Sequence, residues 1–189
     1  MQPFPKRRHL AVCCTAVFLS SAWADAPQAD ETAGWYDRAT ASLKRTWKDG
    51  TADLYLPLYS WHLPWAYTQE QVDNYNTYPL GLGIGRGRYD EDGDSHAFYV
   101  IGFQDSHSKP EYQIGYIYKT YWPISGDLKA GLGYTVFLGA RSDWNNYLPF
   151  PGILPVASLE YSKVSLDATY VPGGEGNGNV LFIWARVRF

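Results

Sequence analysis

Hydrophobic and polar residues alternate along most of this chain, as they do in strands with two different faces. The segment 180–189 shows this most clearly, because every second residue is apolar while Trp184, Arg186 and Arg188 fill positions between them. The same period predicts eight strands, at residues 53–60, 79–89, 95–104, 111–121, 128–139, 152–160, 163–171 and 179–189. An even number of strands, several near the ~9–11 residues that cross a bilayer at a tilt, predicts an all-β, eight-stranded antiparallel transmembrane barrel.

The connections between these strands alternate in length. Residues 90–94, 124–127 and 161–163 have the composition of tight turns. The longer connections are residues 61–78, 105–110, 140–151 and 172–178. Because short turns face the periplasm and long loops face outward in bacterial barrels, the pattern predicts a periplasmic N-terminus.

Residues 31–48 follow a helical period instead. Trp35, Ala39, Leu43 and Trp47 recur every fourth position, with basic side chains among the remaining residues. This predicts an amphipathic α-helix, which could pack on a soluble domain. Next to a membrane barrel, we expect it at the membrane interface.

The first 24 residues have the pattern of a secretory signal peptide. Basic residues 6–8 precede an apolar stretch over 10–19, and Ala22-Trp23-Ala24 offers small residues for cleavage before Asp25. The apolar stretch is shorter than the ~20 residues of a membrane-spanning helix. We therefore expect a mature barrel domain over residues 25–189.

Both cysteines, Cys13 and Cys14, lie in the predicted signal peptide, so the mature chain would contain no disulfide and no cysteine metal site. A lipoprotein anchor at Cys13 is the less favoured alternative, because Val12 is bulky where such signals carry a small residue. Cleavage removes three cations and no acids, which lowers the formal charge from −3 to −6. This balance argues against a nucleic-acid partner.

Aromatic residues make up 17% of the chain, although its mean hydropathy is only −0.33. An exported, aromatic-rich chain with alternating polarity is typical of outer-membrane barrels, whose aromatics gather at both membrane interfaces.

Glycines at 81, 83, 85 and 87 leave one face of a predicted strand without side chains. A nucleotide-binding loop would need a helix after them, and none is predicted. Two interpretations stay open, namely a hydrocarbon chain lying against this face or close packing by other side chains of the barrel.

Four prolines, Pro57, Pro79, Pro155 and Pro172, lie in or beside predicted strands. Since proline has no N–H to donate, each weakens strand pairing locally. They could mark strand ends, or they could open the wall to a lipid tail entering sideways.

His62 follows the first predicted strand, and Asp105, Ser106 and His107 follow the third, so all four belong to the outward rim. A histidine, a carboxylate and a hydroxyl on one rim could remove a hydroxyl proton and stabilise an acyl-transfer intermediate. Loops also carry these residue types for other reasons. The chain has no Gly-x-Ser-x-Gly elbow and no His-Glu-x-x-His motif, and no metal or organic cofactor is indicated.

Several motifs resemble the PagP family, the lipid A palmitoyltransferases of Gram-negative outer membranes. The matching motifs are Asp53-Leu54-Tyr55-Leu56-Pro57, Trp61-His62, Phe103-Gln104-Asp105-Ser106, Leu154-Pro155-Val156-Ala157-Ser158, Tyr170-Val171-Pro172-Gly173 and Asn177-Gly178-Asn179-Val180. The likeness runs from about Trp35 to Phe189, apart from a small insertion near Asn145. It implies an N-terminal amphipathic helix and an eight-stranded barrel whose interior holds one acyl chain.

The resemblance also implies an acyltransferase that moves a chain from the sn-1 position of a glycerophospholipid to a hydroxyl of lipid A at the outer leaflet. The family's essential residues match His62, Asp105 and Ser106. His62 would be the general base, and Asp105 would orient it or stabilise its cationic form. Ser106 would be a nucleophile or would hold the developing oxyanion.

Further residues match by resemblance. The family's strand-gap prolines match Pro57 and Pro79 for one lateral opening, and Pro155 and Pro172 for the other. Arg141, in the third outer loop, is a candidate contact for a lipid phosphate.

The pocket floor is where this sequence departs from the family. The family's best-studied members carry a glycine there, which gives a palmitoyl chain its full length. Alignment without gaps from Asp105 puts Ile117 at that position, on the strand that also carries Gly115. Because isoleucine fills that space, we predict a shallower pocket and a donor chain shorter than palmitoyl, at roughly 0.8 kcal/mol per methylene left unburied.

Two other functions fit a small outer-membrane barrel. A structural or adhesion barrel would need none of the rim residues. A lipid carrier would need the pocket but not the histidine, aspartate and serine. We expect the protein to be a monomer.

Overall fold

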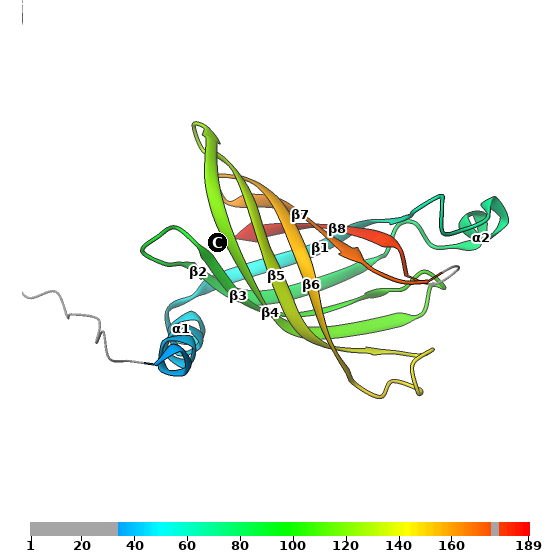
Figure 1. Ribbon diagram of the computed structural model, residues 1–189, viewed down its shortest axis with the longest axis horizontal. Helices are drawn as coiled ribbons and strands as arrows, with labels where there is room; N and C mark the ends of the chain where they lie inside the picture. The colour runs from blue at the N-terminus through cyan, green and yellow to red at the C-terminus, as the bar shows by residue number, and fades with distance from the viewer. Residues whose placement is uncertain (1–33, 175–177) are drawn as a thin grey trace, which may run out of the picture. The chain divides into compact units, whose positions relative to one another are not determined.

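The computed structural model describes residues 34–174 and 178–189; the predicted signal peptide, residues 1–24, lies outside them. The elements, in chain order, are α1 (Trp35–Asp49), β1 (Thr51–His62), α2 (Gln69–Asn74), β2 (Gly81–Tyr89), β3 (Ser95–Gln104), β4 (Pro110–Ser125), β5 (Leu128–Arg141), β6 (Phe150–Tyr161), β7 (Val164–Val171) and β8 (Val180–Arg188). Each strand pairs antiparallel with the next, and β1 pairs with β8, so the sheet closes into a barrel (Figure 1). The predicted fold class is confirmed.

Side chains alternate between the interior and the outside of the wall, as the two-residue period requires. On β5, Thr135 and Phe137 are buried inside, whereas Val136 and Leu138 are exposed on the outer surface. On β8, Arg186 and Arg188 are buried inside the barrel, which confirms the predicted polar face of that strand. No described helix has the length and apolar character needed to cross a membrane.

Exposed aromatic side chains accompany the apolar outer surface. Those near the α2 end include Trp61, Trp65, Tyr78, Tyr112 and Trp144. Those near the α1 end are Trp47, Trp122, Tyr161 and Phe189. Two such groups are expected where a barrel meets both membrane interfaces.

The observed strands differ from the predicted ones at their ends. His62 is the last residue of β1 and Arg141 the last of β5, although the sequence suggested that both follow their strands. Pro79, expected at the start of a strand, instead lies just before β2. The observed strand ends differ from the predicted ones because a polar residue still pairs wherever a neighbouring strand continues beside it. Local composition does not reveal how far that neighbour continues.

Helix α1 contacts the barrel through polar side chains. Arg88 donates from Nη2 to Ser42 Oγ at 2.9 Å and from Nε to Thr46 Oγ1 at 3.2 Å. Thr46 is fully buried, but Leu43 and Trp47 of the apolar stripe remain 37% and 66% exposed. These two side chains are therefore not buried against the barrel as packing on a soluble domain would require, and the place of the helix at the membrane interface stays a prediction.

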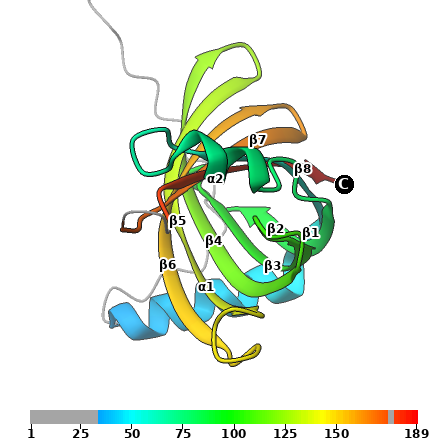
Figure 2. The same ribbon diagram turned by 90° about the vertical axis from the view of Figure 1, so that its right-hand side faces the viewer.

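The two helices lie at opposite ends of the barrel, with α1 below one end and α2 above the other mouth (Figure 1). Seen from the α2 end, the strands form a ring beneath that helix (Figure 2). The four longer connections share the α2 end with α2, and the three tight turns share the α1 end. The alternation predicted from loop length is thus present in the fold.

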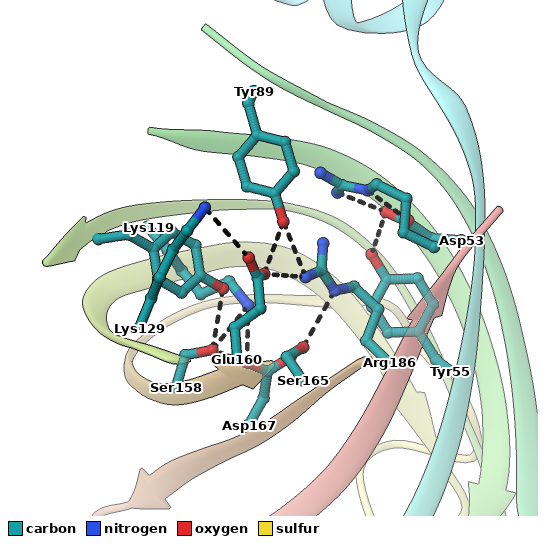
Figure 3. Close-up of polar contacts among 12 residues, drawn as sticks. Asp53, Tyr55, Tyr89, Lys119, Lys129, Ser158, Glu160, Ser165, Asp167 and Arg186 are labelled. Carbon is teal, nitrogen blue, oxygen red and sulfur yellow. Dashed lines mark hydrogen bonds and ion pairs between the residues drawn. The ribbon is translucent and has the colours of Figure 1, made fainter. Parts of the chain in front are cut away.

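The interior near the α1 end is filled by three buried ion pairs, which we call the ionic layer. They are Lys119–Asp167 at 2.6 Å, Arg188–Asp53 at 2.7 Å and Arg186–Glu160. Figure 3 shows the labelled members of these pairs, from Asp53 to Arg186, close together inside the barrel, with hydroxyls of Tyr89, Ser158 and Ser165 bonded to them. Paired and hydrogen-bonded charges can occupy a barrel interior that isolated charges could not.

The alternating glycines of β2 make room for this interior packing. A Cβ at residue 85 would lie 2.8 Å from the Tyr55 ring, and one at residue 87 would collide with Arg188 and Asp53. None of the four glycines lines the cavity described below. Close packing, rather than contact with a hydrocarbon chain, explains these glycines.

The barrel wall is incompletely paired in two places. Pairing of β1 with β2 ends at Tyr55 and Gly83, so Pro57 and the residues after it have no ladder partner on β2. Pairing of β6 with β7 ends at Val156 and Thr169, so Pro155, the residue that precedes Val156, has no ladder partner on β7. Both gaps lie on the α2 side of the last paired residues.

Candidate active site

A cavity of about 500 Å³ occupies the half of the barrel nearer the α2 end. Polar groups line its mouth, namely Ser60, His62, Gln104, Asp105, Ser106, His107, Glu111 and Arg141. Apolar side chains line its depth, among them Ile101, Phe103, Ile117, Phe137, Leu154, Phe182 and Trp184. The shape suits a ligand with a polar head and an apolar tail.

His62 and Ser106 meet at the mouth of this cavity. A hydrogen bond of 2.8 Å joins His62 Nε2 to Ser106 Oγ, although the two residues are 44 positions apart. His62 ends β1 and is 3% exposed, whereas Ser106 lies in the short connection after β3. The ends of β1 and β3, on either side of β2, thus bring together a base and a hydroxyl that the sequence placed only on the same rim.

Asp105 is next to Ser106 but makes no hydrogen bond to His62 within the described residues. Its Oδ1 accepts hydrogen bonds from the backbone N–H groups of His107 and Lys109, both at 2.8 Å. Its Oδ2 is buried without a hydrogen-bond partner, and Arg141 Nη2 lies 3.9 Å away. The expectation that Asp105 orients the imidazole is therefore not what this geometry shows, because the carboxylate holds its own loop instead.

Arg141 lies among carboxylates at the rim. It donates from Nε and Nη2 to Asp143 at 2.6 and 2.9 Å, and its Nη1 lies 3.8 Å from Glu111. Sequence reasoning missed Glu111, which is 8% exposed and begins the inward series of β4. The two-residue period could have placed it inside, but no local signal connects it to Arg141.

The connection between β1 and β2 is fastened across the mouth. Leu63 N donates to Asn179 O at 3.1 Å, and the Tyr67 hydroxyl donates to the carbonyl of Gly178. Burial raises the pKa of Tyr67, so its hydroxyl stays protonated and able to donate. This connection therefore joins the β7–β8 connection beside His62.

The cavity ends at a floor that includes Ile117, which is 4% exposed. Tyr99 Oη and Thr135 Oγ1 also line this level and share a hydrogen bond of 3.0 Å. Gly115 does not line the cavity, because the Tyr99 ring and Phe137 cover it; a Cβ there would meet both at 2.8 Å. The floor predicted from Ile117 and Gly115 thus consists of Ile117 with Tyr99 and Thr135.

The ionic layer lies directly beneath this floor. Lys119, the next inward residue of β4 after Ile117, is 2% exposed and paired with Asp167. Tyr55, which lines the cavity, reaches Asp53 with its hydroxyl at 3.5 Å. An apolar tail that passed the floor would have to displace buried ion pairs. The depth of the cavity is therefore limited first by the floor residues and then by the ionic layer.

Within residues 34–174 and 178–189, no group of three or more His, Cys, Asp or Glu residues is arranged to hold a metal ion. The side chains at the mouth can instead perform acid–base and nucleophilic chemistry on a carbonyl held near Ser106.

Comparison with known proteins finds one family over most of the chain. The family model described as antimicrobial peptide resistance and lipid A acylation protein PagP matches residues 42–186. A lipid A acyltransferase PagP of Laribacter hongkongensis is 46% identical over 81% of this chain and 74% of its own length. Those of Methylobacillus flagellatus and Bordetella parapertussis are each 43% identical, covering 82% and 92% of this chain and 84% and 96% of their own.

Among solved structures, Neisserial surface protein A (NspA) covers 74% of this chain and 95% of its own, at 17% identity. Its TM-score is 0.43, a likeness too distant to inform the fold or function of this chain.

Proposed function

Since this chain belongs to the PagP family, we propose that it moves an acyl chain from the sn-1 position of a glycerophospholipid to a hydroxyl of lipid A. Family membership makes it an outer-membrane acyltransferase whose acceptor is lipid A and whose donor is a lipid. The proposal adds the class of donor, its position of cleavage, the chain length and the residues responsible.

The observation that carries the proposal is the His62–Ser106 hydrogen bond at the mouth of an apolar cavity. A donor tail inserted into the cavity leaves its ester carbonyl at the rim, beside both side chains. Holding the reacting groups this way converts a bimolecular step into a nearly unimolecular one.

We assign the chemistry to three residues. His62 takes the proton from the attacking hydroxyl, and Ser106, 2.8 Å from Nε2, serves as first nucleophile or holds the developing oxyanion. Asp105 positions Ser106, because its Oδ1 accepts two backbone N–H groups of the loop that presents the serine. An acyl-enzyme detected by intact-protein mass spectrometry would select the nucleophile role for Ser106.

Lipid access is proposed at the two gaps in the wall. Pro57 and Pro79 flank the unpaired part of the β1–β2 seam, and Pro155 and Pro172 flank that of the β6–β7 seam. Each gap lies at the cavity's level, where a tail could enter without crossing the rim.

Arg141 remains a proposed contact for a lipid phosphate. Its bidentate partner Asp143 is 52% exposed and can exchange with a phosphate.

The decisive assay uses purified, folded protein with lipid A and a phospholipid carrying different chains at sn-1 and sn-2. We expect lipid A to gain the sn-1 chain while a lysophospholipid retaining the sn-2 chain accumulates. Gain of the sn-2 chain would contradict the donor position. Free fatty acid without acylated lipid A would indicate a hydrolase, and saturable lipid binding without either product would favour a carrier.

Chain length provides a second test. The wild-type protein should prefer a donor shorter than palmitoyl, and Ile117→Gly should shift the preference upward by about two or three methylenes, each worth roughly 0.8 kcal/mol when buried. The gain stays small because Tyr99 and Thr135 still close the floor. The measurement is mass spectrometry of lipid A after competition among donors of different length.

The matched control is Ile114→Gly, which makes the same change on β4 at a residue that is 57% exposed on the outer surface. It should leave chain selection unchanged. A palmitoyl preference in the wild type, or an equal shift in both variants, would contradict the role of Ile117.

A further inference from the structure

Two tyrosines from the β1–β2 connection enclose the imidazole of His62. The Tyr75 ring lies 4.7 Å from it between centroids, tilted by 36°, and the Tyr67 ring lies 5.2 Å away at 85°. The two tyrosines also meet each other at 5.5 Å, and Tyr75 meets His107 at 5.3 Å. The imidazole therefore contacts two aromatic rings in addition to Ser106.

No carboxylate holds this histidine in the part of the chain that the structure describes. Its hydrogen bond runs between Nε2 and Ser106, and Asp105 is engaged with its own loop and faces Arg141. A general base that takes a proton becomes cationic, and in catalytic triads a carboxylate stabilises that charge and fixes the ring. Here another group has to perform both tasks.

The Tyr75 ring is close enough to stabilise the cationic imidazole and to fix its orientation. With the ring centroids 4.7 Å apart and the planes tilted by 36°, the imidazole lies within the distance at which the aromatic quadrupole attracts a cation. The Tyr67 ring is nearly perpendicular to the imidazole, in an edge-to-face contact.

The backbone around Tyr75 ties it to the same site. Thr68 and Gln71 form a capping box that starts α2, and Tyr75 N donates to Val72 O at 3.1 Å where the helix ends. The next residue, Asn76, donates its backbone N–H to the carbonyl of Ser106 at 2.8 Å. The segment that carries the ring is therefore fixed to the residue that His62 must face.

We propose that Tyr75 is a positioning residue for acyl transfer: its ring fixes the imidazole of His62 toward Ser106 and stabilises the imidazolium formed during the reaction. The inference rests on the proposed role of His62 as general base. It concerns the ring alone, since the Tyr75 hydroxyl has no hydrogen bond within the described residues.

The test compares Tyr75→Phe with Tyr75→Leu in detergent-solubilised, folded protein. Phenylalanine keeps the aromatic face, so kcat should stay within about twofold of wild type. Leucine removes it, so kcat should fall by roughly 5- to 30-fold while KM for the phospholipid changes little. Tyr75→Met provides a second non-aromatic side chain, with the same expectation, in case the leucine variant does not fold.

Three outcomes would overturn the inference: an unchanged kcat without the ring, an equal loss in Tyr75→Phe, or a change in KM alone. The loss caused by Tyr75→Leu should also disappear in a His62→Gln background, because the ring acts through the histidine. If His62→Gln by itself keeps full activity, the proposed function of His62 fails. If His62→Gln is inactive but Tyr75→Leu is fully active, only the role of Tyr75 fails.

Discussion

The His62→Gln variant is expected to lose acyl transfer by roughly 10²- to 10⁴-fold while its barrel stays folded, the range typical for removal of a general base. Glutamine matches the size of the imidazole and can still bond to Ser106, so the rim keeps its shape. It cannot accept the hydroxyl proton, however. The loss should therefore appear in kcat, measured as acylated lipid A formed per minute.

The matched control for this variant is His96→Gln. His96 lies at the opposite end of the barrel, where Nε2 bonds to Asp90 Oδ2 at 2.8 Å, and it does not line the cavity. The His96→Gln variant should therefore transfer acyl chains at close to the wild-type rate. A His62→Gln variant as active as this control would remove the base from the proposed mechanism.

The second large effect is expected from Asp167→Leu, which leaves Lys119 as an uncompensated buried charge. Asp167 is fully buried and accepts hydrogen bonds from Lys119 at 2.6 Å and from Ser165 at 3.0 Å. Breaking a buried ion pair by removing one partner typically costs about 3–5 kcal/mol. The measurement is the free energy of unfolding, from denaturant titration of the barrel in lipid vesicles.

Replacing both partners distinguishes a charge effect from a packing effect. The double variant Lys119→Met with Asp167→Leu removes the pair without leaving a lone charge, and such replacements are often neutral or stabilising by about 1–4 kcal/mol. We expect it to recover most of the stability lost in Asp167→Leu. If the double variant is as unstable as the single one, the ionic layer contributes through packing and hydrogen bonds rather than charge compensation.

Much of the barrel could be predicted because one rule governs every strand. A residue of the wall faces either lipid or lumen, so a period of two appears in the sequence wherever the wall runs. That rule located all eight strands and put Arg186 and Arg188 on the face opposite the apolar residues of β8, which the structure shows to be the inner face. It could not locate the strand ends at His62 and Arg141, since these depend on how far the neighbouring strand continues.

The sequence predicted which residues belong to the candidate site, but not how their side chains contact one another. His62 and Ser106 were assigned from resemblance, and strand closure brings them to 2.8 Å. Asp105 was assigned as the partner of His62, yet its Oδ1 accepts hydrogen bonds from two backbone N–H groups of its own loop. Tyr75 carried no signal at all, since its contact with His62 arises only from the path of the connection that α2 interrupts.

What the sequence determined by itself was the alternation, and with it the closed wall and the rim on which the reactive residues lie. Whatever depends on contacts across the barrel was decided by tertiary structure. Gly115 illustrates this: it was predicted to form the pocket floor with Ile117, but the Tyr99 ring from the neighbouring strand covers it. Periodicity fixes which way a side chain points, whereas what it touches depends on the register and closure of all eight strands together.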